Sequence, residues 1–131
     1  GLESRICLHG KVPYSQMLQA YASADIFALP SLRETTGTAV IEAMSNKLPV
    51  VALKQNGVKH LVADRAGILA DIGTKQETVQ NLADALRRLI EDQELRRRLG
   101  EQGYQILQAE HTWQVKFSRM EEIYIAIKNE T

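Results

Sequence analysis

The sequence predicts an α/β fold, a parallel sheet of about four strands followed by C-terminal helices. Short runs rich in Ile, Val and Leu alternate with helical patterns in the first half of the chain, whereas the second half is helical. The runs do not alternate apolar with polar residues, which is typical of parallel strands covered on both faces. With 131 residues and no long linker or internal repeat, the chain is expected to form one domain with its own core.

The first two predicted elements are a strand over residues 5–9 and a helix over residues 15–24. Ser15 can cap that helix. Four residues of the helix have core-facing spacing: Met17, Leu18, Tyr21 and Ala22. The single cysteine, Cys7, excludes an internal disulfide. Its place between two apolar residues predicts a small buried side chain rather than a reactive thiol.

A strand over residues 25–29, a helix over residues 38–46 and a strand over Val50–Leu53 come next, and a last strand covers residues 68–70. Strand, helix, strand, helix, strand is the order of a doubly wound, Rossmann-like unit. Ligands of such units bind outside the carboxyl ends of the strands. The residues that follow strand 25–29 are therefore expected to line a ligand crevice.

Three helices are predicted in the second half. Residues 76–92, with Thr74 as a cap, carry one apolar stripe: Val79, Leu82, Ala83, Leu86, Leu89 and Ile90. Residues 94–108 carry Leu95, Leu99, Tyr104 and Leu107, and no helix breaker separates the two helices. The closing helix, residues 112–129, begins with a threonine cap and repeats Val115, Phe117, Met120, Ile123, Tyr124 and Ile127.

Charge excludes several classes of partner. Sixteen basic and sixteen acidic residues give a formal net charge of zero, which argues against binding nucleic acid or a membrane surface through bulk electrostatics. Arginines cluster at residues 87–88 and 96–98, but acidic residues are interleaved with them, which indicates a solvated helix face. No run approaches the roughly 18 apolar residues of a membrane span, and no signal-peptide pattern is visible, so we expect a cytoplasmic protein.

The most informative segment is residues 34–44. Glu34 and Glu42 are eight positions apart, with a Thr-Thr-Gly turn between them and an apolar helical run that begins at Thr38. A helix N-terminus offers unpaired N–H groups and the positive end of the helix dipole, which suit a phosphate. Glu42, about one turn into the helix, and Glu34, in the loop, are placed to accept hydrogen bonds from hydroxyl groups nearby. Phosphate beside two carboxylates predicts a nucleotide-sugar site.

This segment resembles the donor-binding half of a GT-B glycosyltransferase, and in particular the retaining glycosyl transferases group 1 family. The residues that carry the resemblance are Pro30, Ser31, Glu34, Gly37, Glu42, Ala43, Met44, Pro49, Val50, Val51 and Ala52. Three further blocks, residues 6–12, 66–69 and 111–113, resemble the family in the same order. The resemblance therefore extends over most of the chain and implies a partial GT-B donor domain.

The resemblance implies a role for each residue of the segment. Glu42 would accept hydrogen bonds from the ribose hydroxyls, and Glu34 would act in catalysis by contacting the transferred sugar and helping to place positive charge at its anomeric carbon. Gly37 and Thr38 would give backbone N–H groups to the diphosphate. Structural alternatives stay open: a surface glutamate for Glu42, a loop acid that caps the next helix for Glu34, and plain turn geometry for Gly37.

The family places the nucleotide base near Lys11 and Val12, although Lys11 could equally be a solvated loop residue. His60 stands where the family has a glutamate, in a segment expected to form a turn. It could donate to a phosphate or sugar oxygen, or be a buried structural histidine. The three histidines have no partners at ligand spacing, so no metal site is predicted. The resemblance implies no cofactor other than the nucleoside-diphosphate sugar, which is the donor substrate.

The family's donor domain normally includes two earlier strand–helix units, with an Arg and a Lys that neutralise the diphosphate, and it follows an acceptor domain. Residues 1–131 are therefore expected to be a single truncated donor-binding domain, inactive alone. The intact enzyme would transfer a sugar, with retention, to a glycan, lipid or small acceptor, for example in polysaccharide biosynthesis, and could lie at the inner membrane. The alternative is a non-catalytic nucleotide-sugar-binding subunit that acts with a separate acceptor subunit.

The expected truncation has a consequence for the sheet. In the strand order 3-2-1-4-5-6, residues 5–9 would be the third strand and the other three predicted strands the fourth to sixth. The edge of strand 25–29 would then be uncovered. Either strand 5–9 moves in beside it, which the short connection favours, or two chains pair across it. We expect the isolated chain to form a homodimer or larger assembly and to bind nucleotide weakly or not at all.

Overall fold

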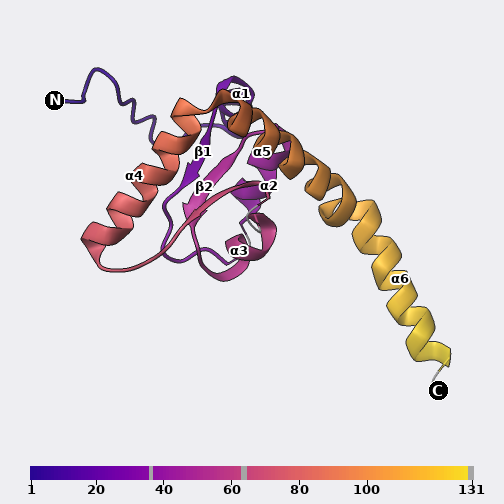
Figure 1. Cartoon of the computed structure of the whole chain (residues 1–131). Helices are drawn as coiled ribbons and strands as arrows, with labels where there is room; N and C mark the ends of the chain where they lie inside the picture. Colours follow the sequence, from indigo (N-terminus) through magenta and orange to yellow (C-terminus); the bar gives the residue numbers. More distant parts are fainter. Residues whose placement is uncertain (36, 63–64, 130–131) are drawn as a thin grey trace.

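The computed structural model describes residues 1–35, 37–62 and 65–129 (Figure 1). Its elements, in chain order, are α1 (Tyr14–Ser23), β1 (Phe27–Leu29), α2 (Thr38–Ser45), β2 (Val50–Leu53), α3 (Asn56–Val62), β3 (Gly67–Ala70), α4 (Lys75–Glu91), α5 (Gln93–Ile106), the π-helical turn η1 (Leu107–His111) and α6 (Trp113–Asn129).

The sheet is parallel, as predicted, and contains three strands among the described residues, in the order β1-β2-β3. Phe27 lies opposite Val50, and Val50 opposite Gly67. All four residues of the central strand β2 are buried. The order matches the last three strands of the doubly wound arrangement, so the chain has an α/β fold with a smaller sheet than expected.

The predicted strand over residues 5–9 is wrong. The N–H groups of Arg5 and Ile6 donate to the carbonyl of Leu2, so the segment begins with a local turn and contributes no strand to the sheet. Residues 1–11 are exposed, and Leu8 is 92% exposed. Cys7 is exposed as well, against its predicted burial, because no neighbouring strand covers it. The predicted insertion of this segment beside β1 does not occur (Figure 1).

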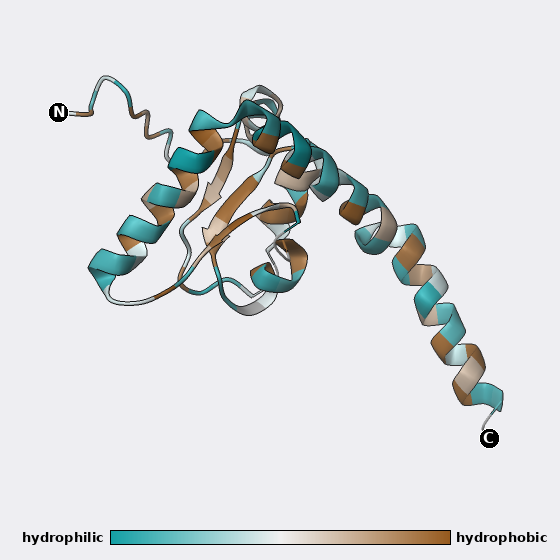
Figure 2. Ribbon diagram, viewed as in Figure 1, coloured by the Kyte–Doolittle hydropathy of each residue, from teal (hydrophilic) through white to brown (hydrophobic). Residues whose placement is uncertain are grey.

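Helices cover both faces of the sheet and form two cores. On one face, Val50 and Ala52 of β2 pack with buried residues of α1, α2, α3 and the end of α5. On the other, Val51 packs with Ala85 and Leu89 of α4 and with Leu99 of α5. Figure 2 shows the strands as apolar. The side chains of β2 thus alternate between two apolar layers, which explains why its sequence is apolar throughout.

Two of the long helices, α4 and α6, begin with the threonine caps that the sequence predicts. Thr74 and Glu77 form a reciprocal capping box at the start of α4. The side chain of Asp92 accepts from the N–H of Leu95 at 2.8 Å, which separates α4 from α5 where the sequence showed no breaker. On α6, the N–H of Val115 donates to the hydroxyl of Thr112 at 3.4 Å.

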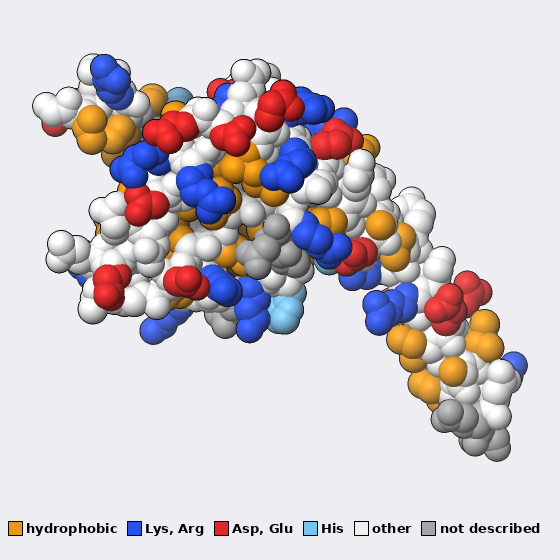
Figure 3. Space-filling model, viewed as in Figure 1, with side chains coloured by type: hydrophobic (Ala, Val, Ile, Leu, Met, Phe, Trp, Pro, Cys, Tyr) orange, Lys and Arg blue, Asp and Glu red, His pale blue; other side chains and the backbone are white. Residues whose placement is uncertain are grey.

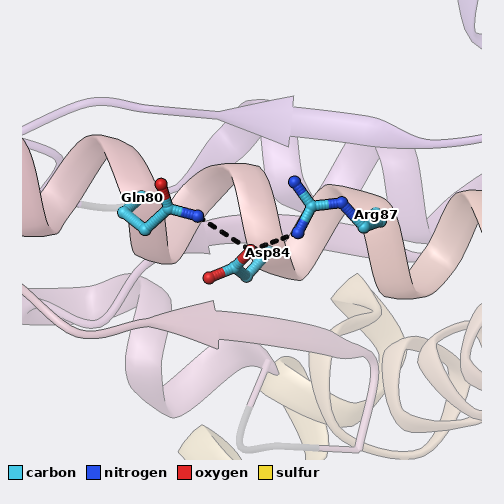
Figure 4. A network of polar contacts seen from close by, with 3 residues as sticks. All are labelled: Gln80, Asp84 and Arg87. Carbon is cyan, nitrogen blue, oxygen red and sulfur yellow. Dashed lines mark hydrogen bonds and ion pairs between the residues drawn. The ribbon is translucent and has the colours of Figure 1, made fainter.

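The outward face of α4 is polar, as expected of its arginines. Gln80 donates to the Oδ1 of Asp84 at 3.0 Å, and Arg87 forms an ion pair with the same oxygen (Figure 4). These hydrogen bonds, first that from Gln80 and then that from Arg87, lower the pKa of Asp84. Glu94 and Arg97 form a further ion pair at 3.1 Å on α5. These pairs lie on a solvated face, where water and salt screen the charges, so they contribute little to stability.

Several residues predicted for the core are exposed instead. On α1 only Tyr21 is buried, whereas Met17 and Leu18 are 37% and 43% exposed. On α4, Val79 and Ile90 are 61% and 65% exposed. Each has core-facing spacing, but α1 and α4 bury only part of their apolar stripes, at Tyr21 on α1 and at Ala85 and Leu89 on α4. In the part of the chain that the structure describes, no helix is long and apolar enough to cross a bilayer.

Candidate functional site

The loop after β1 carries Glu34, and α2 carries Glu42 in its second turn. Gly37, the residue before α2, has φ 65° and lies in the left-handed region. This backbone angle favours glycine. A β-carbon added there would lie 2.8 Å from the Cδ1 of Leu61 on α3, so the end of that side chain would have to shift. The carbonyl of Gly37 accepts from the N–H groups of Val40 and Ile41, which starts the helix.

Glu34 is half-buried, and its Oε1 accepts from the N–H of Gly37 at 3.1 Å. This contact is the capping arrangement that the sequence left open as an alternative to sugar contact. It also occupies one of the N–H groups that were expected to face a phosphate. Thr38, the first residue of α2, is exposed at the helix start. Of the first N–H groups of α2, that of Thr38 is therefore the nearest candidate for a phosphate oxygen.

Glu42 lies one turn further along α2 and is half-buried. Its Oε1 accepts from the hydroxyl of Tyr14 at 3.1 Å, and its Oε2 accepts from the hydroxyl of Tyr21 at 3.1 Å. Both tyrosines belong to α1. Burial, followed by the hydrogen bond to Glu42, raises the pKa of Tyr21 to about 12. The hydrogen bond from Tyr14 to Glu42 raises the pKa of Tyr14 as well.

The sequence did not single out these tyrosines as site residues. The sequence predicts Tyr21 only as a core residue, and Tyr14 precedes the helix predicted over residues 15–24. Their spacing indicates that they share one face of the helix, because residues seven apart in an α-helix lie two turns apart on the same side. Tyr14 and Tyr21 have that spacing. What the sequence could not tell is that α1 presents this face to α2.

The strand ends come together as the doubly wound pattern predicts. The side-chain amide of Gln55, after β2, donates to the carbonyl of Ser31, after β1. The N–H of Lys54 donates to the carbonyl of Ala70 at 2.9 Å, which joins the ends of β2 and β3. The loop that carries Glu34 is thereby tied to the carboxyl edge of the sheet, where ligands of such sheets bind.

Among the described residues, no hydrogen bond or ion pair joins the remaining predicted site residues to Glu34 or Glu42. Lys11 is exposed and Val12 half-buried, both just before α1. His60 lies on α3, so the predicted turn is a helix there. His60 is exposed rather than buried, because α3 turns Val58, Leu61 and Val62 toward the core and His60 away from it. Within the described residues, no group of three or more His, Cys, Asp or Glu could hold a metal ion.

Comparison with known proteins gives a consistent result. The family model described as "Glycosyl transferases group 1" matches residues 1–106. A D-inositol 3-phosphate glycosyltransferase of Corynebacterium glutamicum (strain R) is 33% identical over 132 residues, which are 99% of this chain and 30% of that protein. The sulfoquinovosyl transferase of Arabidopsis thaliana is 37% identical over 95 residues, 70% of this chain and 18% of that protein.

Solved structures agree with this result. The sucrose-phosphate synthase of Thermosynechococcus elongatus superimposes with a TM-score of 0.81 at 26% identity, covering 99% of this chain and 32% of that one. The C-terminal domain of a glycosyl transferase group 1 family protein from Francisella tularensis has a TM-score of 0.67 at 26% identity, over 81% of this chain and 53% of that one. The chain thus spans about a third or less of the curated relatives and about half of that separate C-terminal domain.

Proposed function

Because the chain belongs to the glycosyl transferases group 1 family, we propose that it is the donor-binding part of a GT-B glycosyltransferase that transfers a sugar with retention from a nucleoside-diphosphate sugar. The observation that carries the proposal is the start of α2. There Glu34 and Glu42 flank a left-handed Gly37 at the carboxyl edge of a parallel sheet. The acceptor would be a glycan, a lipid or a small molecule.

Each group then has a physical task. The start of α2 at Gly37 and Thr38 attracts the diphosphate, since the helix dipole and unpaired N–H groups are positive there. Glu42 accepts hydrogen bonds from the ribose. Glu34 orients the transferred sugar and stabilises positive charge that develops at the anomeric carbon. The Oε1 of Glu34 accepts from the Gly37 N–H, so on donor binding the carboxylate must share that N–H with the ligand or release it.

The departing diphosphate needs positive charge beside it, which is a major electrostatic requirement of the reaction. Lys11, before α1, and His60, on α3, are the candidate donors to the nucleotide within the predicted site. We propose that the main cationic groups, together with the acceptor domain, come from the part of the enzyme that this chain does not include. The isolated chain would then bind nucleotide weakly and have no transferase activity.

The test of the ribose role uses Glu42→Gln in the full-length enzyme, measured by calorimetry with UDP, GDP and ADP. The amide retains a carbonyl acceptor for the tyrosines but removes the charge. A hydrogen bond to a charged group contributes about 1.5–3 kcal/mol, so we expect at least a several-fold loss of nucleotide affinity. Glu91→Gln, an exposed glutamate at the end of α4, is the control. Equal affinity in the two variants contradicts the assignment.

The test of the sugar role uses Glu34→Gln. An interaction made mainly in the transition state affects turnover more than ground-state binding. We expect a large fall in kcat with a small change in the donor Kd. If only the donor KM changes, Glu34 is a binding residue. If turnover and binding are both unchanged, Glu34 only caps the turn at Gly37.

We also propose that the isolated chain associates through β1. In the described part of the chain, β1 pairs with β2 on one side and with no strand on the other. Unpaired N–H and C=O groups on a strand edge recruit further strands. Light scattering at micromolar concentration should give a dimer or a larger species. A sharp monomer that also binds nucleotide tightly would contradict both this proposal and the expected weak binding.

A further inference from the structure

Tyr14 and Tyr21 hold the carboxylate of Glu42 from one side. They lie seven residues apart on α1, and each donates to a different oxygen of Glu42 at 3.1 Å. The other main contacts of Glu42 involve its carbonyl, which accepts from Ser45 at 2.7 Å and from Asn46 at 2.9 Å. The residue is therefore held at both its backbone and its side chain.

The two tyrosines differ in burial, and the difference matters. Tyr21 is 4% exposed, and its ring lies 5.8 Å from that of Phe27. A buried tyrosine hydroxyl needs a partner, so its bond to Glu42 has a purely structural explanation. Tyr14 is 60% exposed. Its hydroxyl could be satisfied by water, so its contact with Glu42 has no such explanation.

The Glu42 carboxylate can accept more hydrogen bonds than the two tyrosines donate to it. An ionised carboxylate offers about four acceptor positions, two on each oxygen. Each tyrosine uses one position on its own oxygen, which leaves one position on each oxygen for other donors. Two adjacent acceptors on one rigid group match two adjacent hydroxyls, such as the 2′- and 3′-hydroxyls of a ribose.

We propose that Tyr14 and Tyr21 are positioning residues that fix the Glu42 carboxylate so that its two oxygens accept both hydroxyls of a ribose. This inference rests on the proposed function and extends it, because it makes the site selective for ribonucleotides over 2′-deoxyribonucleotides. The raised pKa values of both tyrosines agree with it, since a tyrosine must keep its proton to donate. Fixing the side chain before binding also avoids part of the entropic cost of ordering it.

The test measures selectivity in a full-length protein that carries this chain. The affinities of a ribonucleoside diphosphate (UDP, GDP or ADP, whichever binds) and of its 2′-deoxy counterpart are compared in four proteins. These are the wild type, Tyr14→Phe, Tyr21→Phe and, as a control on α6, Tyr124→Phe. We expect the wild type to prefer the ribonucleotide by on the order of tenfold, as for the loss of one hydrogen bond to a charged group.

Tyr14→Phe should reduce that preference several-fold while the affinity for the 2′-deoxy compound changes less than about twofold. Tyr21→Phe should do the same with a lower melting temperature, and the control should match the wild type. A purely structural role would weaken both ligands equally, so an unchanged preference in both variants overturns the inference. Absence of any nucleoside-diphosphate binding by the wild type overturns the proposed function itself, and the inference with it.

A second measurement needs no ligand. The ionisation of the four tyrosines is followed by ultraviolet absorbance in the wild type, Glu42→Gln and the control Glu91→Gln. Removing the charge of Glu42 should lower the pH at which two tyrosines ionise, because the hydrogen bond to Glu42 raises the pKa of Tyr14 and adds to the effect of burial on the pKa of Tyr21. Identical titrations of the wild type and Glu42→Gln would overturn the inference.

Discussion

Strand β2 and helix α6 both carry apolar side chains at regular spacing, but their surroundings are opposite. All four residues of β2 are buried between helices on the two faces of the sheet. On α6 no residue is buried, and Trp113, Phe117 and Ile123 are each more than half exposed. Figure 3 shows α6 extending from the body with its apolar side chains at the surface. A periodic pattern thus predicts which face requires burial but not whether a partner is present.

The two ends of the chain differ from its middle in the same way. Residues 1–11 are exposed, and α6 contacts η1 but lies outside the two cores. Between these ends, residues 14–111 form the α/β body. The free energy of unfolding should therefore depend on residues of the body and hardly at all on residues of the ends. Four comparisons of matched variants test this expectation, in order of decreasing effect.

The largest difference should come from two methionines. Met44 on α2 is fully buried, whereas Met120 on α6 is 47% exposed. Met44→Ala should lower the free energy of unfolding by about 2–5 kcal/mol through lost burial and a cavity. Met120→Ala should change it by less than about 0.5 kcal/mol. Urea unfolding checks both values. An equal loss in the two variants would mean that α6 is packed in solution.

Two glycines with left-handed angles give the next comparison. Gly37 and Gly10 have φ values of 65° and 63°. A β-carbon at Gly37 would also lie 2.8 Å from the side chain of Leu61, whereas nothing lies within 4 Å at Gly10. Gly37→Ala should cost about 1–2 kcal/mol from the backbone angle, because Gly37 is held within the folded body. Gly10→Ala meets the same angle but should cost less, because the exposed residues 1–11 can change their backbone without disturbing either core. Thermal unfolding separates them. An equal loss at Gly10 would place residues 1–11 in the folded body.

Two threonine caps give the third comparison, one on a helix of the body and the other at the start of α6. Thr74 caps α4 with a reciprocal box, and Thr112 caps α6 through a single bond of 3.4 Å. Thr74→Ala should cost about 1 kcal/mol of global stability. Thr112→Ala should reduce the helical signal of α6 in circular dichroism and leave the unfolding midpoint unchanged. A shift of the midpoint in Thr112→Ala contradicts the independence of α6 from the body.

The smallest effect concerns pH. The pKa of Asp84 is lowered from 3.8, so its stabilising contribution is present above that value and is lost as the pH falls through the depressed pKa. Asp84→Asn should therefore be slightly less stable than the wild type near neutral pH and equal to it in strong acid. Glu121→Gln on α6, outside the two cores, should match the wild type near neutral pH. A difference at Asp84 that persists in acid would mean that charge is not its cause.

Sequence patterns predict the elements of the body well, because each one has a neighbour that its pattern anticipates. Val50–Leu53 is a strand as predicted, and the predicted helices begin and end within a few residues of their predicted limits. The exception in the body is α3, which the sequence predicts as a turn. The π-helical turn at Leu107–His111 was not predicted, since nothing in its composition separates it from an α-helix. The strand predicted over residues 5–9 is wrong because a strand requires a hydrogen-bonding partner, and an apolar pattern does not show whether one is present.

The candidate site shows the same limit at a smaller scale. The spacing of Glu34 and Glu42 around a helix start was readable, because both residues lie in one continuous segment. The capping bond from the Gly37 N–H to Glu34 was foreseen only as an alternative. The contacts of Tyr14 and Tyr21 with Glu42 depend on how two helices pack, and this is a property of the fold rather than of any local pattern.

The extended backbone of Thr112 fixes the direction in which α6 leaves the body. Thr112 has ψ 155°, so the helical path from α5 through η1 stops there and starts again at Trp113. The 17 residues of α6 span roughly 25 Å at 1.5 Å per residue. A rotation of about 20° at this one residue would carry the far end of α6 through as much as roughly 9 Å. The direction in which the helix presents its apolar face is therefore set by two dihedral angles.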